Sequence, residues 1–258
     1  MKKILMLIAL LPVLTACDNI GPDDRYIEMG EVLVTRNVLL EEFTGQLCTN
    51  CPDAHRVIHS LEAQYGDNLI TVSIHAGKGT FGIPSPYGLM MEEGEEYAQY
   101  WGVYSFPAGV VDRTSGLLDY GNFSQAIREE MGKTTSLELS LEAQLSEDGK
   151  NVEVFTTMVT PTSMEGKLQL WVVESGIVAM QIDNGKTIED YVHNNVFRAC
   201  VNGQWGEDAP LKGNVVEYKS NEIPVADIWK PENLSIIGFY YNNTGVVQVE
   251  RCEVKGSK

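Results

Sequence analysis

Basic residues are scarce in this sequence. Its 258 residues include 19 Lys and Arg against 36 Asp and Glu, which gives a formal net charge of −17 at pH 7. A protein with this excess of negative charge is repelled by nucleic-acid phosphates and by anionic lipid headgroups. The composition therefore argues against a nucleic-acid partner and against electrostatic binding to a membrane surface.

Long apolar runs are also missing from most of the chain. A transmembrane helix needs roughly 18 or more consecutive, mainly apolar residues, and no stretch after residue 17 approaches that length. Residues 1–3 give a positive start, residues 4–11 a short apolar core, and residues 14–17 a small-residue end that closes on Cys17. This is the layout of a secretory signal peptide.

The end of this signal peptide resembles a bacterial lipobox. The resemblance implies cleavage before Cys17 and lipid attachment to that residue, and an ordinary soluble secreted protein is the alternative. Acyl chains on Cys17 would attach the protein to a membrane without spanning it. Residues 18–33 contain Gly-Pro, Asp-Asp and little periodicity, so we expect them to form an acidic tether.

Cysteine is used sparingly, with five residues in the whole chain. Once Cys17 is assigned to lipid attachment, the other four form a close pair, Cys48 and Cys51, and a distant pair, Cys200 and Cys252. Disulfides persist outside the cytosol. We therefore expect a structural disulfide between Cys200 and Cys252, with two unpaired buried thiols as the alternative.

The close pair lies between a β-prone run at residues 37–43 and a run with helical spacing at residues 54–65. A helix N-terminus carries unpaired N–H groups and about half a positive charge, so it stabilises a thiolate. Cys48 could then act as a nucleophile, and Cys51 could resolve the resulting mixed disulfide. A static structural disulfide between the two is the alternative.

Residues 101–112 add a second motif, in which Gly102-Val103 precede Phe106-Pro107 and a short β-prone run. Together with the strand–CxxC–helix–strand pattern before it, this motif resembles thioredoxin. The resemblance implies that Pro107 is a cis-proline that packs beside the CxxC and shapes a substrate groove. A cis peptide bond is accessible at low free-energy cost only before proline.

The same resemblance gives a role to Glu42, which lies six residues before Cys48. It implies that Glu42 is a buried acid that moves protons for Cys51, and a solvent-facing strand residue is the alternative. Leu47 and Thr49-Asn50 depart from the thioredoxin pattern. Because the residues between the cysteines tune the redox potential, the direction of electron flow is not predicted.

A metal site is the competing interpretation of the CxxC, because His55 and His59 follow it. A helix rises about 1.5 Å per residue, so Cys51 and His59 would lie roughly 12 Å apart, too far for both to bind one zinc at about 2 Å. Cys48, Cys51 and His55 could share an ion, but helical histidines are more often amphipathic surface residues. We therefore expect no metal and no other cofactor.

The pattern changes to β-structure from Thr134 onward. Residues 136–143 and 151–155 alternate polar and apolar side chains around a turn, which predicts a hairpin. Further β-prone runs occupy residues 167–174, 195–201, 214–219, 234–241 and 246–254. Such a series of short strands is typical of an immunoglobulin-like sandwich. The predicted fold is thus an α/β thioredoxin-like domain at residues 34–133, followed by an all-β immunoglobulin-like sandwich at residues 134–258.

Residues 191–198, Tyr-Val-His-Asn-Asn-Val-Phe-Arg, are unusually polar and aromatic for the start of a strand. They could form a ligand surface or a hydrogen-bonded loop. With the lipobox, the Glu-Glu-Phe-Thr-Gly…Cys-x-x-Cys-Pro segment and Phe-Pro-Ala, they resemble the 28-kDa outer-membrane protein family of Bacteroidota lipoproteins. This likeness spans most of the mature chain and implies an outer-membrane location, on either the periplasmic or the surface face.

Two functions remain open from the sequence. The first is a thiol–disulfide oxidoreductase that acts on protein thiols or disulfides, with Cys48 as nucleophile, Cys51 resolving, Pro107 shaping the groove and Glu42 moving protons. The second is a non-catalytic surface or periplasmic binding lipoprotein that uses the same scaffold without turnover.

Overall fold

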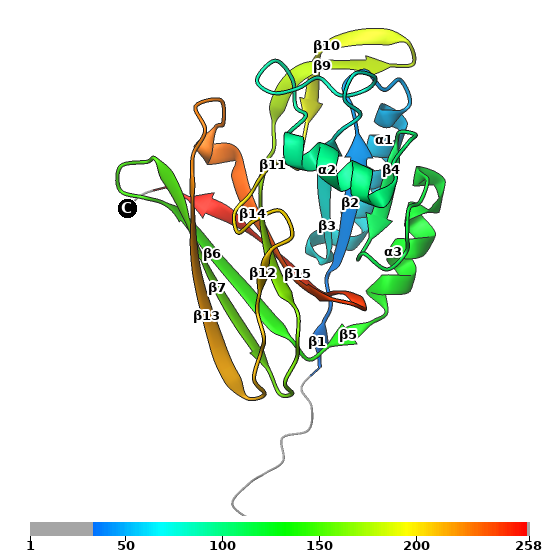
Figure 1. Ribbon diagram of the computed structural model, residues 1–258. Helices are drawn as coiled ribbons and strands as arrows, with labels where there is room; N and C mark the ends of the chain where they lie inside the picture. The colour runs from blue at the N-terminus through cyan, green and yellow to red at the C-terminus, as the bar shows by residue number, and fades with distance from the viewer. Residues whose placement is uncertain (1–32, 257–258) are drawn as a thin grey trace, which may run out of the picture. The chain divides into compact units, whose positions relative to one another are not determined.

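The computed structural model describes residues 33–256, and these residues belong to one compact unit (Figure 1). The predicted signal peptide at residues 1–17, the lipid site at Cys17 and nearly all of the tether at residues 18–33 lie outside the described residues. Within the described residues, no helix is both long enough and apolar enough to cross a membrane.

Three α-helices and short 3₁₀ turns accompany the strands of the described chain. The helices are α1 (Cys51–Tyr65), α2 (Glu92–Trp101) and α3 (Phe123–Met131), and the 3₁₀ turns are Gly66–Asn68, Tyr120–Asn122 and Pro231–Asn233. The strands are β1 (Val34–Thr35), β2 (Val38–Thr44), β3 (Leu69–His75), β4 (Ala108–Val111), β5 (Thr134–Thr135), β6 (Glu138–Leu145), β7 (Asn151–Thr160), β8 (Lys167–Glu174), β9 (Ile177–Asp183), β10 (Lys186–His193), β11 (Val196–Cys200), β12 (Glu207–Asp208), β13 (Val215–Pro224), β14 (Leu234–Asn242) and β15 (Gly245–Lys255).

One mixed sheet of eleven strands runs through the described chain in the order β13-β7-β6-β15-β14-β8-β11-β3-β2-β4, with β12 beside β8. Strands β2 and β3 are parallel from Val38↔Leu69 to Thr44↔His75, and β4 is antiparallel to β2. Two short ribbons, β1 with β5 and β9 with β10, lie outside this sheet.

Strand β2 is buried on both faces, and its alternation assigns each side chain to a face. Leu39 and Phe43 join the core that contains Tyr97 of α2, whereas Val38 and Leu40 join the core that contains residues of α1 and α3. The two consecutive glutamates are therefore divided between the faces: Glu41 lies on the α2 face and Glu42 on the α1 face.

The predicted fold class is wrong. Strand β11 pairs with β3 in parallel at Val196↔Ser73 and with β8 in antiparallel, so strands of the C-terminal half continue the same sheet as β2 and β3. The two halves also share a core, in which Phe43 and Val72 pack with Trp171, Phe197 and Phe239. The structure is thus a mostly β protein with a large mixed sheet, not an α/β thioredoxin-like domain followed by an all-β immunoglobulin-like sandwich.

The reason for this error is physical. Most of the predicted strand runs are strands in the structure, but alternation along a strand does not say which edge that strand joins. A free edge of β3 would leave backbone N–H and C=O groups unpaired. Strand β11 satisfies part of that edge and thereby merges two predicted units into one sheet.

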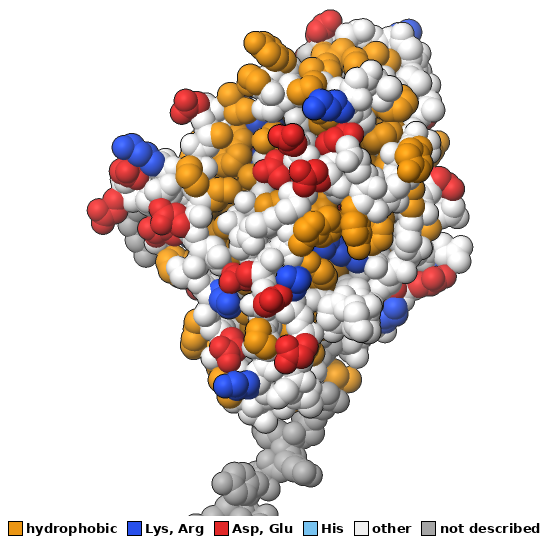
Figure 2. Space-filling model, viewed as in Figure 1, with side chains coloured by type: hydrophobic (Ala, Val, Ile, Leu, Met, Phe, Trp, Pro, Cys, Tyr) orange, Lys and Arg blue, Asp and Glu red, His pale blue; other side chains and the backbone are white. Residues whose placement is uncertain are grey.

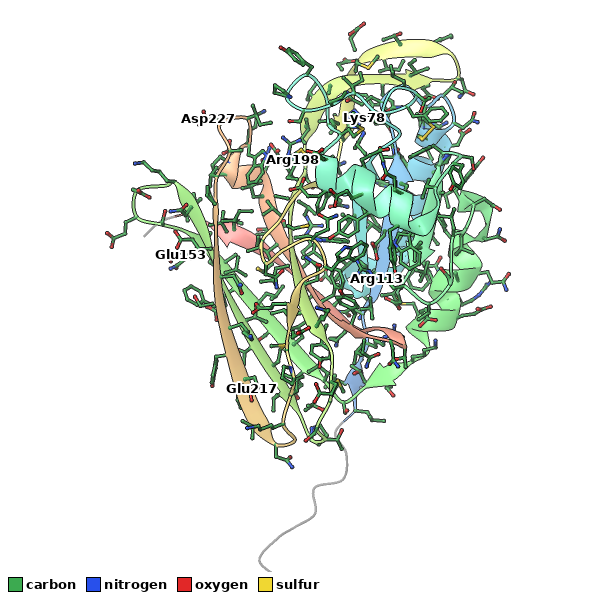
Figure 3. The ribbon with its side chains drawn as sticks, in the orientation of Figure 1. Lys78, Arg113, Glu153, Arg198, Glu217 and Asp227 are labelled. Atoms are coloured by element: carbon green, nitrogen blue, oxygen red, sulfur yellow. A yellow bond between two sulfur atoms is a disulfide. The ribbon has the colours of Figure 1, made fainter. Side chains whose placement is uncertain are left out.

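A buried ion pair stabilises the core that the two halves share. Arg113 Nε donates to Glu41 Oε1 at 2.7 Å, and the two side chains are 6% and 0% exposed. The guanidinium carbon lies 4.7 Å from the ring centroids of both Phe239 and Tyr241. Figure 3 labels Arg113 in this position between α2 and the strands of the C-terminal half.

Aromatic side chains cover this ion pair on the outside. Figure 2 shows hydrophobic side chains gathered on this face of the molecule, with basic atoms visible among them. The pocket at Arg113 is lined by residues that include Tyr100, Trp101, Trp205 and Tyr241. Arg113 thus contributes both charge and stacking area, which are worth more in a site shielded from water.

We expect Arg113→Leu to lower the free energy of unfolding by about 3–5 kcal/mol, because it leaves the Glu41 carboxylate buried and unpaired. The double variant Glu41→Leu/Arg113→Leu should recover a substantial part of that loss, since it removes both charges. Urea unfolding of the three proteins measures the difference. Equal losses in the single and double variants would contradict the ion-pair argument.

Candidate functional site

The CxxC lies where β2 ends and α1 begins, as the sequence predicted. Cys48 and Cys51 form a disulfide, with their Cα atoms 5.5 Å apart. Cys51 is the first residue of α1, followed by Pro52 and Asp53. Proline is tolerated in the first turn of a helix because the backbone N–H that it lacks would have no intrahelical partner there, and an acidic side chain near a helix N-terminus is favourable.

The disulfide is covered by the protein. Cys48 is 2% exposed and Cys51 is fully buried. The segment before α2 forms part of this cover, because Leu47 N–H donates to Phe81 O at 2.9 Å and Leu89 N–H donates to Gln46 Oε1 at 2.9 Å. The sulfur atoms are therefore shielded from a client protein in this conformation.

A second part of the cover is the β9–β10 hairpin, which the sequence reasoning missed. Its turn residues Asn184 and Gly185 have φ of 49° and 76°, as a two-residue hairpin turn requires. Asn-Gly between two β-prone runs is a strong hairpin signal in a sequence. That signal was present at Asn184-Gly185 and could have revealed the hairpin.

Pro107 is brought to the same end of the sheet. The Phe106–Pro107 peptide bond is cis. Because Ala108 pairs with Phe43 in the β4–β2 ladder, Pro107 lies one position further along, where β2 ends and the CxxC loop begins. The role of Pro107 in shaping a substrate groove stays a prediction.

Glu42 is buried, so the solvent-facing alternative is wrong. It is 0% exposed, and neither carboxylate oxygen has a hydrogen-bond partner among the described residues. The side chain of His55 lies beside it, with Nε2 3.6 Å from Glu42 Oε1. The same Nε2 lies 3.0 Å from Thr44 Oγ1, and His55 Nδ1 lies 2.8 Å from the hydroxyl of Tyr191.

Tyr191 thus connects this buried carboxylate to the hairpin. Burial raises the pKa of Tyr191 to about 12, and the negative charge of Glu42 adds to the shift. The phenol therefore stays protonated and can both donate and accept a hydrogen bond. The side chains of Glu42, His55 and Tyr191 form a continuous polar row from β2, through α1, to β10.

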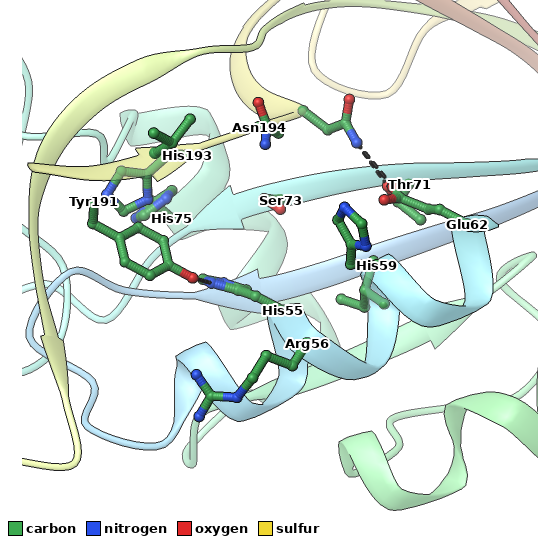
Figure 4. A pocket seen from close by; sticks show the side chains of 13 residues that line it. His55, Arg56, His59, Glu62, Thr71, Ser73, His75, Tyr191, His193 and Asn194 are labelled. Atoms are coloured by element: carbon green, nitrogen blue, oxygen red, sulfur yellow. Dashed lines mark hydrogen bonds between the residues drawn. The ribbon is translucent and has the colours of Figure 1, made fainter.

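This row ends at a pocket of about 220 Å³ that all four histidines of the sequence line (Figure 4). His55 and His59 come from α1, His75 from β3 and His193 from β10. The ring centroids of His75 and His193 are 5.3 Å apart. Residues that are far apart in the sequence are brought together here by the hairpin.

Two of these histidines are held neutral. Burial lowers the pKa of His193 to about 4 and lowers that of His75 well below its usual value, with a further contribution from His193. Both nitrogens of His75 and the Nε2 of His193 lack a hydrogen-bond partner among the described residues. Protonation of either imidazole ring would place a positive charge in a buried site, 5.3 Å from the centroid of the other ring.

No group of three or more His, Cys, Asp or Glu side chains within residues 33–256 is arranged to hold a metal ion. Cys48 and Cys51 are bonded to each other, so neither sulfur is available as a thiolate ligand in this state. Both ring nitrogens of His55 are within hydrogen-bonding distance of other side chains, Nδ1 near the hydroxyl of Tyr191 and Nε2 near that of Thr44.

The predicted disulfide between Cys200 and Cys252 is wrong, because both are free thiols. Across the sheet, Cys200 of β11 is in register with Arg251 of β15, with one residue of β8 and one of β14 between them. Cys252 follows Arg251, so the two cysteines are separated by three strand spacings, which is roughly 14 Å. A disulfide needs Cα atoms within about 7 Å. The two residues also pack against different cores, and burial raises the pKa of both thiols to about 11.

The buried histidines predict an acid-sensitive fold. His193 has a pKa of about 4 in the folded state and about 6.5 in an unfolded chain. The unfolded state therefore binds more protons, so stability is present above pH 6.5 and is lost as the pH falls toward 4. We expect this residue to account for a loss on the order of 2–3 kcal/mol.

Urea unfolding between pH 7 and pH 4 measures this loss. His193→Gln should flatten the pH dependence, because glutamine does not titrate. His59→Gln is the matched control, since His59 is an exposed histidine of the same pocket. A pH dependence in His193→Gln as steep as in the unmodified protein would contradict the assignment.

Comparison with solved structures supports a shared fold. HBP35 of Porphyromonas gingivalis matches with a TM-score of 0.70 at 16% identity, over 85% of this chain and 76% of that one. Protein AGR_C_4864 from Agrobacterium tumefaciens matches with a TM-score of 0.51 at 14% identity, over 85% of this chain and 95% of that one. A domain of the outer membrane lipoprotein Omp28 from P. gingivalis also matches, over 47% of this chain and 90% of that one at 18% identity, but its TM-score of 0.34 is too low to show a shared fold.

Among curated proteins, none matches the sequence. Residues 94–258, which are more than half of the chain, match the family described as outer membrane protein Omp28. The resemblance and the outer-membrane location predicted from the sequence are confirmed by this match. The chain belongs to the Omp28 family of outer membrane proteins.

Proposed function

We propose that this outer membrane protein is a thiol–disulfide oxidoreductase whose reactive bond is Cys48–Cys51. One observation carries the proposal: the disulfide lies at the N-terminus of α1, on the same face of the sheet as the buried and unpaired carboxylate of Glu42. The helix terminus stabilises a thiolate, and a buried carboxylate can exchange a proton with one. An envelope location, outside the reducing cytosol, suits disulfide chemistry.

The exchange would proceed in two displacements. A client thiolate attacks Sγ of Cys48, the Cys48–Cys51 bond breaks, and Cys51 leaves as a thiolate while the client is joined to Cys48. A second client thiolate then attacks the client sulfur of that mixed disulfide and releases Cys48. The client is oxidised to a disulfide, and the two cysteines gain two electrons. The same steps in reverse reduce a client disulfide.

Glu42, His55 and Tyr191 would move the proton in this scheme. The Glu42 carboxyl can pass a proton to the Cys51 thiolate as it leaves. The carboxylate can then be reprotonated through His55, which lies 3.6 Å away and contacts the hydroxyl of Tyr191. Since Tyr191 lines the histidine pocket, this row gives a buried acid a route to solvent.

We expect Cys48→Ala to reduce catalysed insulin reduction by dithiothreitol to the uncatalysed rate, because the attacking sulfur is missing. Cys252→Ser is the control, since Cys252 is a free thiol of raised pKa in a different part of the sheet. It should keep the rate of the unmodified protein. Unchanged turnover in Cys48→Ala would contradict the oxidoreductase proposal.

We expect Glu42→Gln to slow turnover by roughly 100-fold, the lower end of what general acid–base catalysis supplies. The neutral amide also removes any dependence of the rate on ionisation of Glu42. The pH–rate profile is therefore the decisive readout. A change of rate with pH that reports ionisation of Glu42 in the unmodified protein should be absent from Glu42→Gln. Glu62→Gln, which replaces another carboxylate near the pocket, should leave the profile unchanged.

The burial of the disulfide favours a second function, that of a non-catalytic binding lipoprotein. With Cys48 2% exposed and Cys51 buried, the bond could simply clamp the start of α1. In that case Cys48→Ala would lower stability but change no client reaction. The insulin assay separates the two functions, because only the first predicts turnover by the unmodified protein above the uncatalysed rate.

A further inference from the structure

The β9–β10 hairpin differs from the other strands that surround the CxxC. It forms a two-stranded sheet of its own and pairs with no other strand of the described chain. At one end Gly176 has φ of 70°, and at the other Asn195 has φ of 53°. These ends meet, because Gly176 N–H donates to Asn194 Oδ1 at 3.0 Å. The two ends of the hairpin therefore meet the sheet at the same place, and each end has a residue with positive φ.

The hairpin holds the CxxC loop mainly through hydrogen bonds. These run from Gln181 Nε2 to Gly45 O (3.2 Å) and Cys48 O (3.0 Å), from Ile182 N to Gln46 O (2.8 Å), from Asn184 N to Thr49 O (3.2 Å), from Gly185 N to Thr49 Oγ1 (2.8 Å), and from Gln46 Nε2 to Met180 O (3.1 Å). Each contact reaches residues 45–49, the loop that carries Cys48.

No apolar residue of the hairpin is fully buried or belongs to one of the hydrophobic cores, although Ile177, Met180, Ile182 and Ile188 are half-buried. Of the hairpin residues, only Gln181 and His193 are buried, and both are polar. Val178 and Val192, which face each other across the ribbon, are 61% and 52% exposed. At the base, Tyr191 and His193 contact His55 and His75 rather than a hydrophobic core. Water can replace such polar contacts, so this element opens at a lower free-energy cost than the core strands.

We propose that the β9–β10 hairpin is a lid over the Cys48–Cys51 disulfide, that it opens as a unit about Gly176 and Asn194-Asn195, and that Gln181 is the residue that holds it closed. Gln181 is fully buried, and its amide bonds the carbonyl of Cys48 itself. The biological meaning of this lid rests on the proposed oxidoreductase function. The effect of the lid on access to the disulfide is independent of that proposed function.

Reduction of the disulfide by dithiothreitol tests the lid directly. One thiolate of the reagent attacks Sγ of Cys48 and releases Cys51. The second thiol of the reagent then closes a cyclic disulfide and releases Cys48, so that two electrons pass from the reagent to the protein. Quenching with an alkylating agent and weighing the protein by mass spectrometry counts the cysteines that have been freed.

Gln181→Met keeps the length of the side chain but removes its hydrogen-bond donors. We expect reduction to accelerate by about ten- to a hundredfold, the effect of losing one to two hydrogen bonds that hold a closed state. Thr49→Val removes the acceptor for Gly185 N–H from the other side of the interface and should accelerate reduction by a smaller factor. Val178→Thr is the matched control on the exposed face of β9 and should leave the rate unchanged.

Equal reduction rates in the unmodified protein, Gln181→Met and Thr49→Val would overturn the lid. Should Gln181→Met fail to fold, Thr49→Val and hydrogen exchange of the unmodified protein decide instead. The amides of Ile182 and Asn184 should exchange faster than those of β2 and β3, and exchange at the same rate would also overturn the proposal. Faster reduction in these variants without insulin turnover in any of them would support the lid and reject the oxidoreductase function.

Discussion

The pairing of β11 with β3 is the constraint on which the rest of the structure depends. Ser73 N–H donates to Asn195 O at 2.8 Å, and Val196 stands beside Ser73 in the parallel ladder. This short contact joins the strands that flank the CxxC to those of the C-terminal half. Because the β9–β10 hairpin immediately precedes β11 in the chain, the same contact places the hairpin over the disulfide.

On the α1 face, the carboxyl-terminal halves of β2 and β3 carry polar side chains where apolar ones would give more stability. Glu42, Thr44, Ser73 and His75 all lie on this face, since in-register parallel strands direct paired residues to the same side. Two of them, Glu42 and His75, are buried with side-chain polar atoms that have no hydrogen-bond partner among the described residues, and such groups destabilise a fold. Concentrating them beneath one hairpin and next to one disulfide is the pattern expected of a functional site.

Much of the candidate site could be predicted from local sequence. The strand–CxxC–helix order follows from the local pattern around Cys48, whereas the cis bond before Pro107 and the burial of Glu42 were implied by the resemblance to thioredoxin. The fold class and the Cys200–Cys252 bridge could not be predicted in this way. Both depend on which strand edges meet, and hydrophobic alternation is the same whichever neighbour a strand has.

The sequence by itself determined the elements of this protein: the family, the outer-membrane location, the CxxC at the start of a helix and most of the strands. The resemblance of its motifs to a known family gave the first two, and local propensity and short spacings encode the others. Only the tertiary structure decided that one sheet joins both halves, that four scattered histidines share one pocket, and that a hairpin covers the disulfide. These outcomes rest on contacts between residues more than 100 positions apart, such as Gln181 with Cys48, for which a single sequence carries no local signal.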